Sequence, residues 1–189
     1  MHRREWLLSM VALAAAKPAL AGTAVHRAAA QDAPAEGLVD HDGRAFTASR
    51  LMGRWTLMTF GFTQCGTTCP ISMAAASEML AHWPDAAPPQ VLLITLDPLS
   101  DTPPRLRDYL RRFDARLTGV TGAPAAIQRA ADRFRVGRRG QGAAVEHSAL
   151  WYLLGPDALV AATFTHDTPP MRLIEQVRAS QRRRSTAGA

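Results

Sequence analysis

The chain lacks an apolar run long enough to cross a bilayer. The apolar stretch from Trp6 to Ala16 has 11 residues, whereas a membrane-spanning helix needs roughly 20. Arg3-Arg4 precedes this stretch and Ala19-Leu20-Ala21, a small-x-small cleavage pattern, follows it. Residues 1–21 are therefore predicted to be a signal peptide cleaved after Ala21, with no permanent membrane anchor. The paired arginines fit a twin-arginine signal or an ordinary charged n-region, so the export route stays open.

Lysine is almost absent, since Lys17 is the only one. Residues 1–21 hold three of the 22 basic and one of the 16 acidic residues, so their removal lowers the formal charge from +6 to +4. This surplus is all arginine. It suits an acidic protein partner, but no lysine-rich or aromatic-interleaved stripe indicates a nucleic-acid partner. The arginine cluster 182–184 is flanked by small and polar residues and is predicted to lie in a disordered tail, residues 181–189.

The length of 189 residues with 47% hydrophobic content predicts one globular domain. Residues 22–37 are rich in alanine and show no helical or strand period, which predicts a flexible leader. The folded domain is expected to span residues 38–180.

Hydrophobic patterning predicts strands at 55–62, 91–96, 149–154 and 159–164. Helices are expected at 70–83, 103–113, 124–134 and 169–179, all four opening on proline, which a first helical turn tolerates. The order β-α-β-α-α-β-β-α predicts an α/β domain of thioredoxin-like fold, with a central mixed sheet flanked by helices. Open α/β sheets place their sites at the carboxyl ends of the strands.

Cysteine is scarce too, and the only two, Cys65 and Cys69, lie where the first predicted core strand gives way to a helix. The positive end of a helix dipole and its unpaired N–H groups favour thiolate over thiol and lower a reference pKa of about 8.5. The alternative is a pair of small buried core residues, but core packing does not require the only two cysteines to lie so close together. In an extracytoplasmic space the pair could also form a disulfide.

A metal at this position needs a further ligand, and His147 is a candidate because it precedes the strand at 149–154, whose entry loop faces the cysteine loop in such a fold. By position alone, a surface or capping histidine remains the alternative for His147. His166 is a weaker candidate, and the other histidines lie elsewhere: His2, His26, His41 and His82. Two thiolates and an imidazole suit copper, particularly Cu(I). Zinc remains chemically possible, although no fourth ligand is evident. Met73 follows Cys69 by one helical turn and is better explained as a core residue.

These motifs in this order resemble the Sco/SenC family of copper-binding, thioredoxin-like proteins that assist cytochrome c oxidase assembly. The resemblance covers residues 38–178 and rests on segments 38–44, 60–70, 95–103 and 146–153, which include the C-x3-C loop and Glu146-His147-Ser148. It implies that Cys65, Cys69 and His147 bind copper, as Cu(I) or Cu(II). It also implies that the partner is the copper-site subunit of cytochrome c oxidase or another copper protein. The predicted signal peptide implies a periplasmic location, and the chain is expected to be a monomer.

The chain departs from the family pattern at three positions. Gly66 and Thr67 stand where the family commonly has Pro and Asp, and Glu146 stands where an aspartate often precedes the histidine. Loss of a negative charge beside the thiols is expected to favour thiolate. Copper affinity or redox potential is therefore expected to differ from that of relatives.

Two functions fit the same residues. One is a copper chaperone that passes copper to the dinuclear copper site of an oxidase subunit. The other is a thiol-disulfide oxidoreductase in which Cys65 and Cys69 reduce the cysteines of a copper-protein partner. A peroxiredoxin-type peroxidase is disfavoured because Thr68-Cys69-Pro70 matches its motif only in part.

Two aspartates, Asp97 and Asp101, follow the central strand, where they could orient the cysteine loop or contact a partner. Asp101 is predicted instead to cap the helix that begins near Pro103. Asp97 is left without an assigned role.

Overall fold

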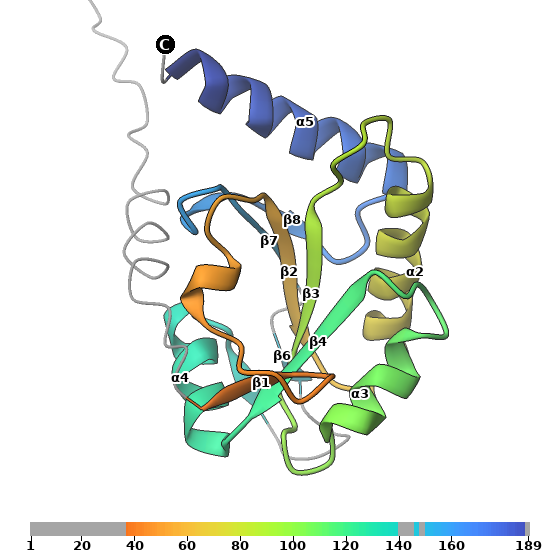
Figure 1. The fold of residues 1–189 in the computed structure, drawn as a ribbon. Helices are drawn as coiled ribbons and strands as arrows, with labels where there is room; N and C mark the ends of the chain where they lie inside the picture. The colour runs from red at the N-terminus through yellow and green to blue at the C-terminus, as the bar shows by residue number, and fades with distance from the viewer. Residues whose placement is uncertain (1–36, 140–145, 148–149, 188–189) are drawn as a thin grey trace, which may run out of the picture.

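A six-stranded mixed sheet forms the centre of the molecule (Figure 1). The computed structural model describes residues 37–139, 146–147 and 150–187, so the predicted signal peptide and nearly all of the leader lie outside the described residues. Across the sheet the strands are β1 (Leu38–Asp40), β4 (Leu117–Gly122), β3 (Gln90–Thr95), β2 (Thr56–Gly61), β7 (Leu150–Leu154) and β8 (Val160–Thr165). Strands β2, β3 and β4 are parallel, whereas β1, β7 and β8 run antiparallel to their neighbours. The predicted thioredoxin-like α/β fold is confirmed.

Helices cover both faces of this sheet (Figure 1). On one face, Leu57 and Leu93 pack with residues of α2 (Thr68–Ala81), α3 (Pro103–Leu110) and α5 (Pro170–Ala187). On the other, Met58 and Leu92 pack with α4 (Pro124–Arg133) and with Leu51, which follows the short helix η1 (Ala48–Arg50). Adjacent strand residues point to opposite faces, so a strand buried on both sides is a continuous apolar run, as predicted for 91–96.

Strand β4 was not predicted, and the two helices expected in succession are separated by it. Its sequence, Leu-Thr-Gly-Val-Thr-Gly, contains two glycines, which weaken a strand pattern. Gly119 is needed because a Cβ there would lie 3.0 Å from both Leu106 Cβ and Leu110 Cδ1 of α3. Gly119 therefore lets α3 pack closely on the sheet, and without a side chain at this position the strand is hard to recognise from the sequence. The short strands β5 (Arg138–Arg139) and β6 (Glu146–His147), which form a separate hairpin, were also missed.

Helix α5 continues to Ala187, well beyond the predicted end at residue 179. Residues 181–187, expected in a disordered tail, are therefore helical. Arg184 forms an ion pair with Asp157 in the turn between β7 and β8, and Arg183 donates to Ser180 Oγ at 2.8 Å. These contacts are side-chain interactions that the local composition did not reveal. Within the described part of the chain, the helices are all too short or too polar to span a membrane.

Candidate metal centre

The cysteine loop joins the carboxyl end of β2 to the start of α2. Leu96 N, just after β3, donates to Gly61 O at 2.7 Å, and Cys65 N donates to Phe62 O at 3.2 Å. These bonds hold the beginning of the loop against the end of the sheet. Both cysteines are free thiols; Cys65 is half-buried and Cys69 is buried. The carboxyl ends of β2 and β3, together with this loop, are called the cysteine edge below.

The Cys65 sulfur takes the place of a helix cap. Thr67 at the N-cap position makes no side-chain capping bond, and Cys65 Sγ instead accepts the backbone N–H of Cys69 at 3.4 Å. The first N–H groups of a helix have no partner within the helix. Burial acts to raise the pKa of Cys65, but N–H groups of Cys69, Thr67 and Thr68 outweigh it, so the pKa is lowered. The predicted effect of the helix N-terminus on a cysteine is confirmed for Cys65.

The pKa of Cys69 shifts in the opposite direction. Its side chain is only 3% exposed, and burial, reinforced by the nearby Cys65 charge, raises its pKa to about 12. A thiol in this setting stays protonated until a metal or a disulfide replaces its proton. The pair therefore combines an accessible thiol that ionises more readily than an ordinary cysteine with a buried thiol that ionises less readily.

Gly61, the last residue of β2, makes room for the buried sulfur. A Cβ at this position would lie 2.5 Å from Cys69 Sγ and 3.1 Å from Leu93 Cδ1. Real Cβ atoms do not approach sulfur so closely, so a side chain here would displace Cys69. Position 61 is therefore glycine because the Cys69 sulfur needs the space, and not because the strand conformation requires it.

Asp101 anchors the loop, which corrects the prediction that it caps α3. Its carboxylate accepts Thr63 N at 3.0 Å, Thr63 Oγ1 at 2.5 Å and Thr95 Oγ1 at 2.7 Å. The N-cap of α3 is Thr102, without a side-chain capping bond. The side chain of Asp101 is fully buried. It ties the loop, two residues before Cys65, to the end of β3.

Other polar groups extend this anchor. Arg105 Nε, on α3, donates to Thr63 Oγ1 at 3.0 Å. Asp97 N donates to Thr95 Oγ1 at 2.9 Å, and the Asp97 carbonyl accepts Asp101 N at 2.8 Å. Asp97 Oδ2 is buried and has no hydrogen-bond partner among the described residues. The second aspartate thus supports the turn that carries Asp101.

Among the described residues, no histidine joins the two sulfurs in a group of three that could hold a metal ion. His41 Nδ1 accepts Gly119 N at 3.0 Å, and His82 Nδ1 contacts Glu78 O at 3.0 Å at the far end of α2. The carbonyl of His166 accepts Ser72 Oγ at 3.3 Å, one helical turn beyond Cys69. Met73 is fully buried in the apolar core, which confirms its assignment as a core residue.

The backbone of His147 lies in β6, paired with Arg138; its side chain is outside the described atoms. Leu150 begins β7, and Thr59 donates to the Leu150 carbonyl at 3.0 Å. Leu150 is three positions after His147 in the chain, so the two Cα atoms are at most about 11 Å apart. The chain therefore returns to the end of β2 shortly after His147.

The described side chains do not by themselves complete a metal site. Within residues 37–137 and 150–186, no three side chains from His, Cys, Asp and Glu are grouped to hold an ion. This includes Cys65, Cys69 and His166. The two sulfurs form a soft donor pair that suits Cu(I) better than hard cations, and a third ligand from His, Asp or Glu would come from outside these ranges or from a partner.

Comparison with known proteins gives a consistent result. The sequence matches the SCO1/SenC family over residues 28–182. It is 34% identical over 159 residues to the mitochondrial SCO2 homolog of Homo sapiens, covering 79% of this chain and 58% of that protein. It is 32% identical over 152 residues to a SCO2-like protein of Rickettsia conorii, covering 75% of this chain and 73% of that one. The chain thus spans little more than half the length of the human relative.

Solved structures resemble the fold closely. Bradyrhizobium japonicum ScoI with copper bound is 32% identical, with a TM-score of 0.68 over 77% of this chain and 95% of that one. Arabidopsis thaliana ScoI with copper bound is 27% identical, with a TM-score of 0.71 over 78% of this chain and 96% of that one.

Proposed function

Because the chain belongs to the SCO1/SenC family, we propose that it is an extracytoplasmic copper chaperone. Cys65 and Cys69 bind copper through sulfur, and His147 supplies the third ligand. The copper passes by ligand exchange to the dinuclear copper site of cytochrome c oxidase or to another copper protein. The resemblance to Sco/SenC proteins supports this recipient, and the predicted signal peptide supports a periplasmic location.

The observation that carries the proposal is the arrangement of the two thiols. Cys65 is accessible, and hydrogen bonds from backbone N–H groups lower its pKa. Cys69 lies behind it in a space that Gly61 leaves open. An incoming Cu(I) ion meets the accessible, more readily ionised sulfur first and then replaces the proton of the buried thiol. Such a stepwise order also allows release, because the exposed ligand is the first that a recipient can displace.

An anaerobic titration tests this proposal. The reduced chain is titrated with Cu(I) against a competing chelator, in parallel with Cys65→Ser, Cys69→Ser, His147→Ala and His166→Ala. One copper per chain is expected, lost on either cysteine change and weakened by His147→Ala. The matched His166→Ala chain should bind like the parent. Failure of the parent chain to compete for Cu(I) would overturn the chaperone proposal.

The second candidate function is a thiol-disulfide oxidoreductase, favoured by the same asymmetry of the thiols. The Cys65 thiolate attacks a partner disulfide, forms a mixed disulfide and expels one partner thiolate. Cys69 then loses its proton, attacks the Cys65 sulfur and expels the second partner thiolate. Two electrons pass to the partner, and the chain is left with a Cys65–Cys69 disulfide. Turnover of a disulfide peptide by a chain that does not bind Cu(I) would favour this function.

A further inference from the structure

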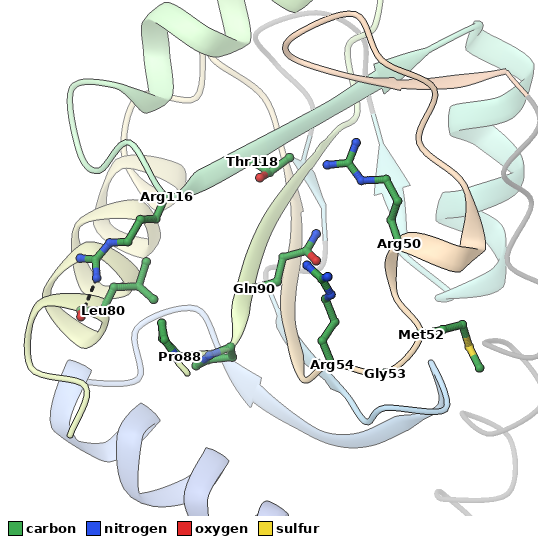
Figure 2. A pocket seen from close by; sticks show the side chains of 10 residues that line it. Arg50, Met52, Gly53, Arg54, Leu80, Pro88, Gln90, Arg116 and Thr118 are labelled. Atoms are coloured by element: carbon green, nitrogen blue, oxygen red, sulfur yellow. Dashed lines mark hydrogen bonds between the residues drawn. The ribbon is translucent and has the colours of Figure 1, made fainter. Parts of the chain in front are cut away.

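The edge of the sheet opposite the cysteines carries a pocket of about 480 Å³. It lies where the parallel strands β2, β3 and β4 begin, near Thr56, Gln90 and Leu117 (Figure 2). Six residues of β3 separate it from the cysteine edge, a span of roughly 20 Å. The pocket, called the arginine pocket below, is therefore distinct from the site described above.

Three arginines are among the described residues that line this pocket, and none of those lining residues is acidic. Arg50 pairs with Asp40 at 2.6 Å, and Arg116 pairs with Asp114 at 2.6 Å. Arg54 is exposed and makes no hydrogen bond or ion pair with the residues that the structure describes. Its guanidinium offers five N–H donors in a planar fork that matches an oxyanion.

The three guanidinium groups are not equivalent. Figure 2 shows the guanidinium of Arg54 beside Gln90 and that of Arg50 directed toward Thr118, whereas Arg116 turns aside and donates to Leu80 O at 3.0 Å. Arg50 already satisfies a buried carboxylate, so Arg54 is the group left to bind a ligand.

Gln90 provides a second, independent sign of a missing partner. Its Oε1 is buried and has no hydrogen-bond partner among the described residues, although its backbone N–H donates to Trp55 O at 2.9 Å. A buried acceptor without a partner is unfavourable, and a carboxylate, which has no hydrogen to donate, does not satisfy it in this orientation of the amide. Rotation of the amide by a half turn would present two N–H donors at the same place. Beside it, Leu80 and Pro88 contribute an apolar wall.

We propose that the arginine pocket binds a carboxylate-bearing ligand. The carboxylate pairs with the Arg54 fork and accepts from the Gln90 amide, and the carbon skeleton of the ligand packs on the apolar wall. This wall favours an organic acid over inorganic phosphate, which would leave it uncovered. The carboxylate can belong to a free polycarboxylate or to an acidic segment of a protein. The proposal does not depend on the copper proposal.

Titration of the reduced, metal-free chain tests the proposal with citrate, a tetraglutamate peptide and inorganic phosphate as probes, at constant ionic strength. Binding is followed by calorimetry and by the backbone amide signals of Gly53 and Gln90. Saturable binding of citrate or of the peptide is expected, and the tighter of the two identifies the source of the carboxylate. Phosphate is expected to bind more weakly than either.

Three variants test whether the carboxylate probes bind in the arginine pocket. Arg54→Gln is expected to weaken binding about tenfold or more, because a hydrogen-bonded ion pair is lost, and it breaks no contact within the fold. Gln90→Glu, which puts a negative charge into the pocket, is expected to abolish binding. The matched control is Arg172→Gln, an exposed arginine on α5 that pairs only with Glu175 in the described structure. Equal weakening by Arg54→Gln and Arg172→Gln, no saturable binding of either carboxylate probe, or phosphate binding as tightly as citrate would each overturn the proposal.

Discussion

At the scale of single residues, the two cysteines differ in solvation and hydrogen bonding, and this difference predicts different reactivity. Only the thiolate reacts with iodoacetamide. In the reduced, metal-free chain, alkylation of Cys65 is expected to rise with a pH midpoint below the ordinary 9.0, and Cys69 only as the pH approaches about 12. At pH 8, Cys65 should be alkylated more than about a hundredfold faster than Cys69. Pulsed alkylation followed by peptide mass spectrometry measures both rates.

Unfolding supplies the control for this measurement. In concentrated guanidinium chloride the helix N-terminus and the burial are both lost, so the two thiols should react at similar rates. Equal rates in the native chain, or faster reaction of Cys69, would contradict the assignment of Cys65 as the accessible, more readily ionised thiol.

Asp101 predicts a second effect at this scale, because its buried carboxylate holds Thr63 and Thr95. Asp101→Ala leaves three donors without their acceptor and is expected to lower the free energy of unfolding by about 2–4 kcal/mol. Asp101→Asn keeps one acceptor oxygen and should cost less. Urea unfolding measures both, with Asp108→Ala on the exposed side of α3 as the control. A loss no larger than that of the control would mean that Asp101 does not anchor the loop.

The sequence identifies the two thiols as candidate site residues, but it does not identify Asp101 as the anchor of their loop. The cysteines can be recognised by their residue type and by their position between a predicted strand and a predicted helix. Asp101 stands two residues before Pro103, where capping is the local expectation, and its partner Thr63 lies 38 residues earlier in the chain. Only the parallel pairing of β2 and β3 brings the two together.

At the scale of elements, the packing of β2 against α2 depends on Gly61. Gly61→Ala is expected to destabilise the fold by about 1–3 kcal/mol, because the new methyl group overlaps the Cys69 sulfur. Gly66→Ala in the same loop is the matched control, since a Cβ there meets no atom within 4 Å. It should leave stability unchanged or raise it by up to about 1 kcal/mol. Thermal and urea unfolding compare the two chains.

A double change tests the stated cause. In a Cys69→Ala background the sulfur is absent, so adding Gly61→Ala should cost much less than it does in the parent chain. If the cost is the same in both backgrounds, the strain at Gly61 comes from Leu93 or from the strand itself rather than from Cys69.

The elements that sequence patterning identified are those with a continuous apolar face. Strand β3 and helix α4 (Pro124–Arg133) match their predictions because burial fixes their residue types. Strand β4 was not predicted because it contains Gly119, a residue that close packing of α3 favours. The predicted end of α5 was too early because side-chain interactions such as the pair Arg184–Asp157 hold its last turns. Tertiary contacts, which a local pattern does not contain, decided both cases.

At the scale of the whole molecule, the sheet separates two chemical surfaces. The cysteine edge holds soft sulfur donors, and the opposite edge holds the arginine pocket. Because the two lie at opposite ends of β3, a ligand at one edge does not block the other. The two proposals are therefore compatible, since a protein that docks at the cysteine edge would leave the arginine pocket open.

Copper binding is expected to stabilise the whole domain, because both thiols belong to elements that pack on the central sheet. A ligand that binds only the folded state at one hundred times its dissociation constant adds about 2.7 kcal/mol. For a domain of this size, that raises the melting temperature by about 5–10 °C. Anaerobic thermal unfolding of the reduced chain, with and without Cu(I) buffered by a chelator, measures the shift.

Variants decide where this stabilisation arises. The shift should vanish in Cys65→Ser and Cys69→Ser, and it should shrink in His147→Ala, whose third ligand is missing. His82→Ala removes an exposed imidazole at the far end of α2 and should show the full shift. An undiminished shift in the cysteine variants would mean that Cu(I) binds elsewhere on the molecule. A full shift with His147→Ala would keep the two sulfurs as ligands and exclude His147 as the third.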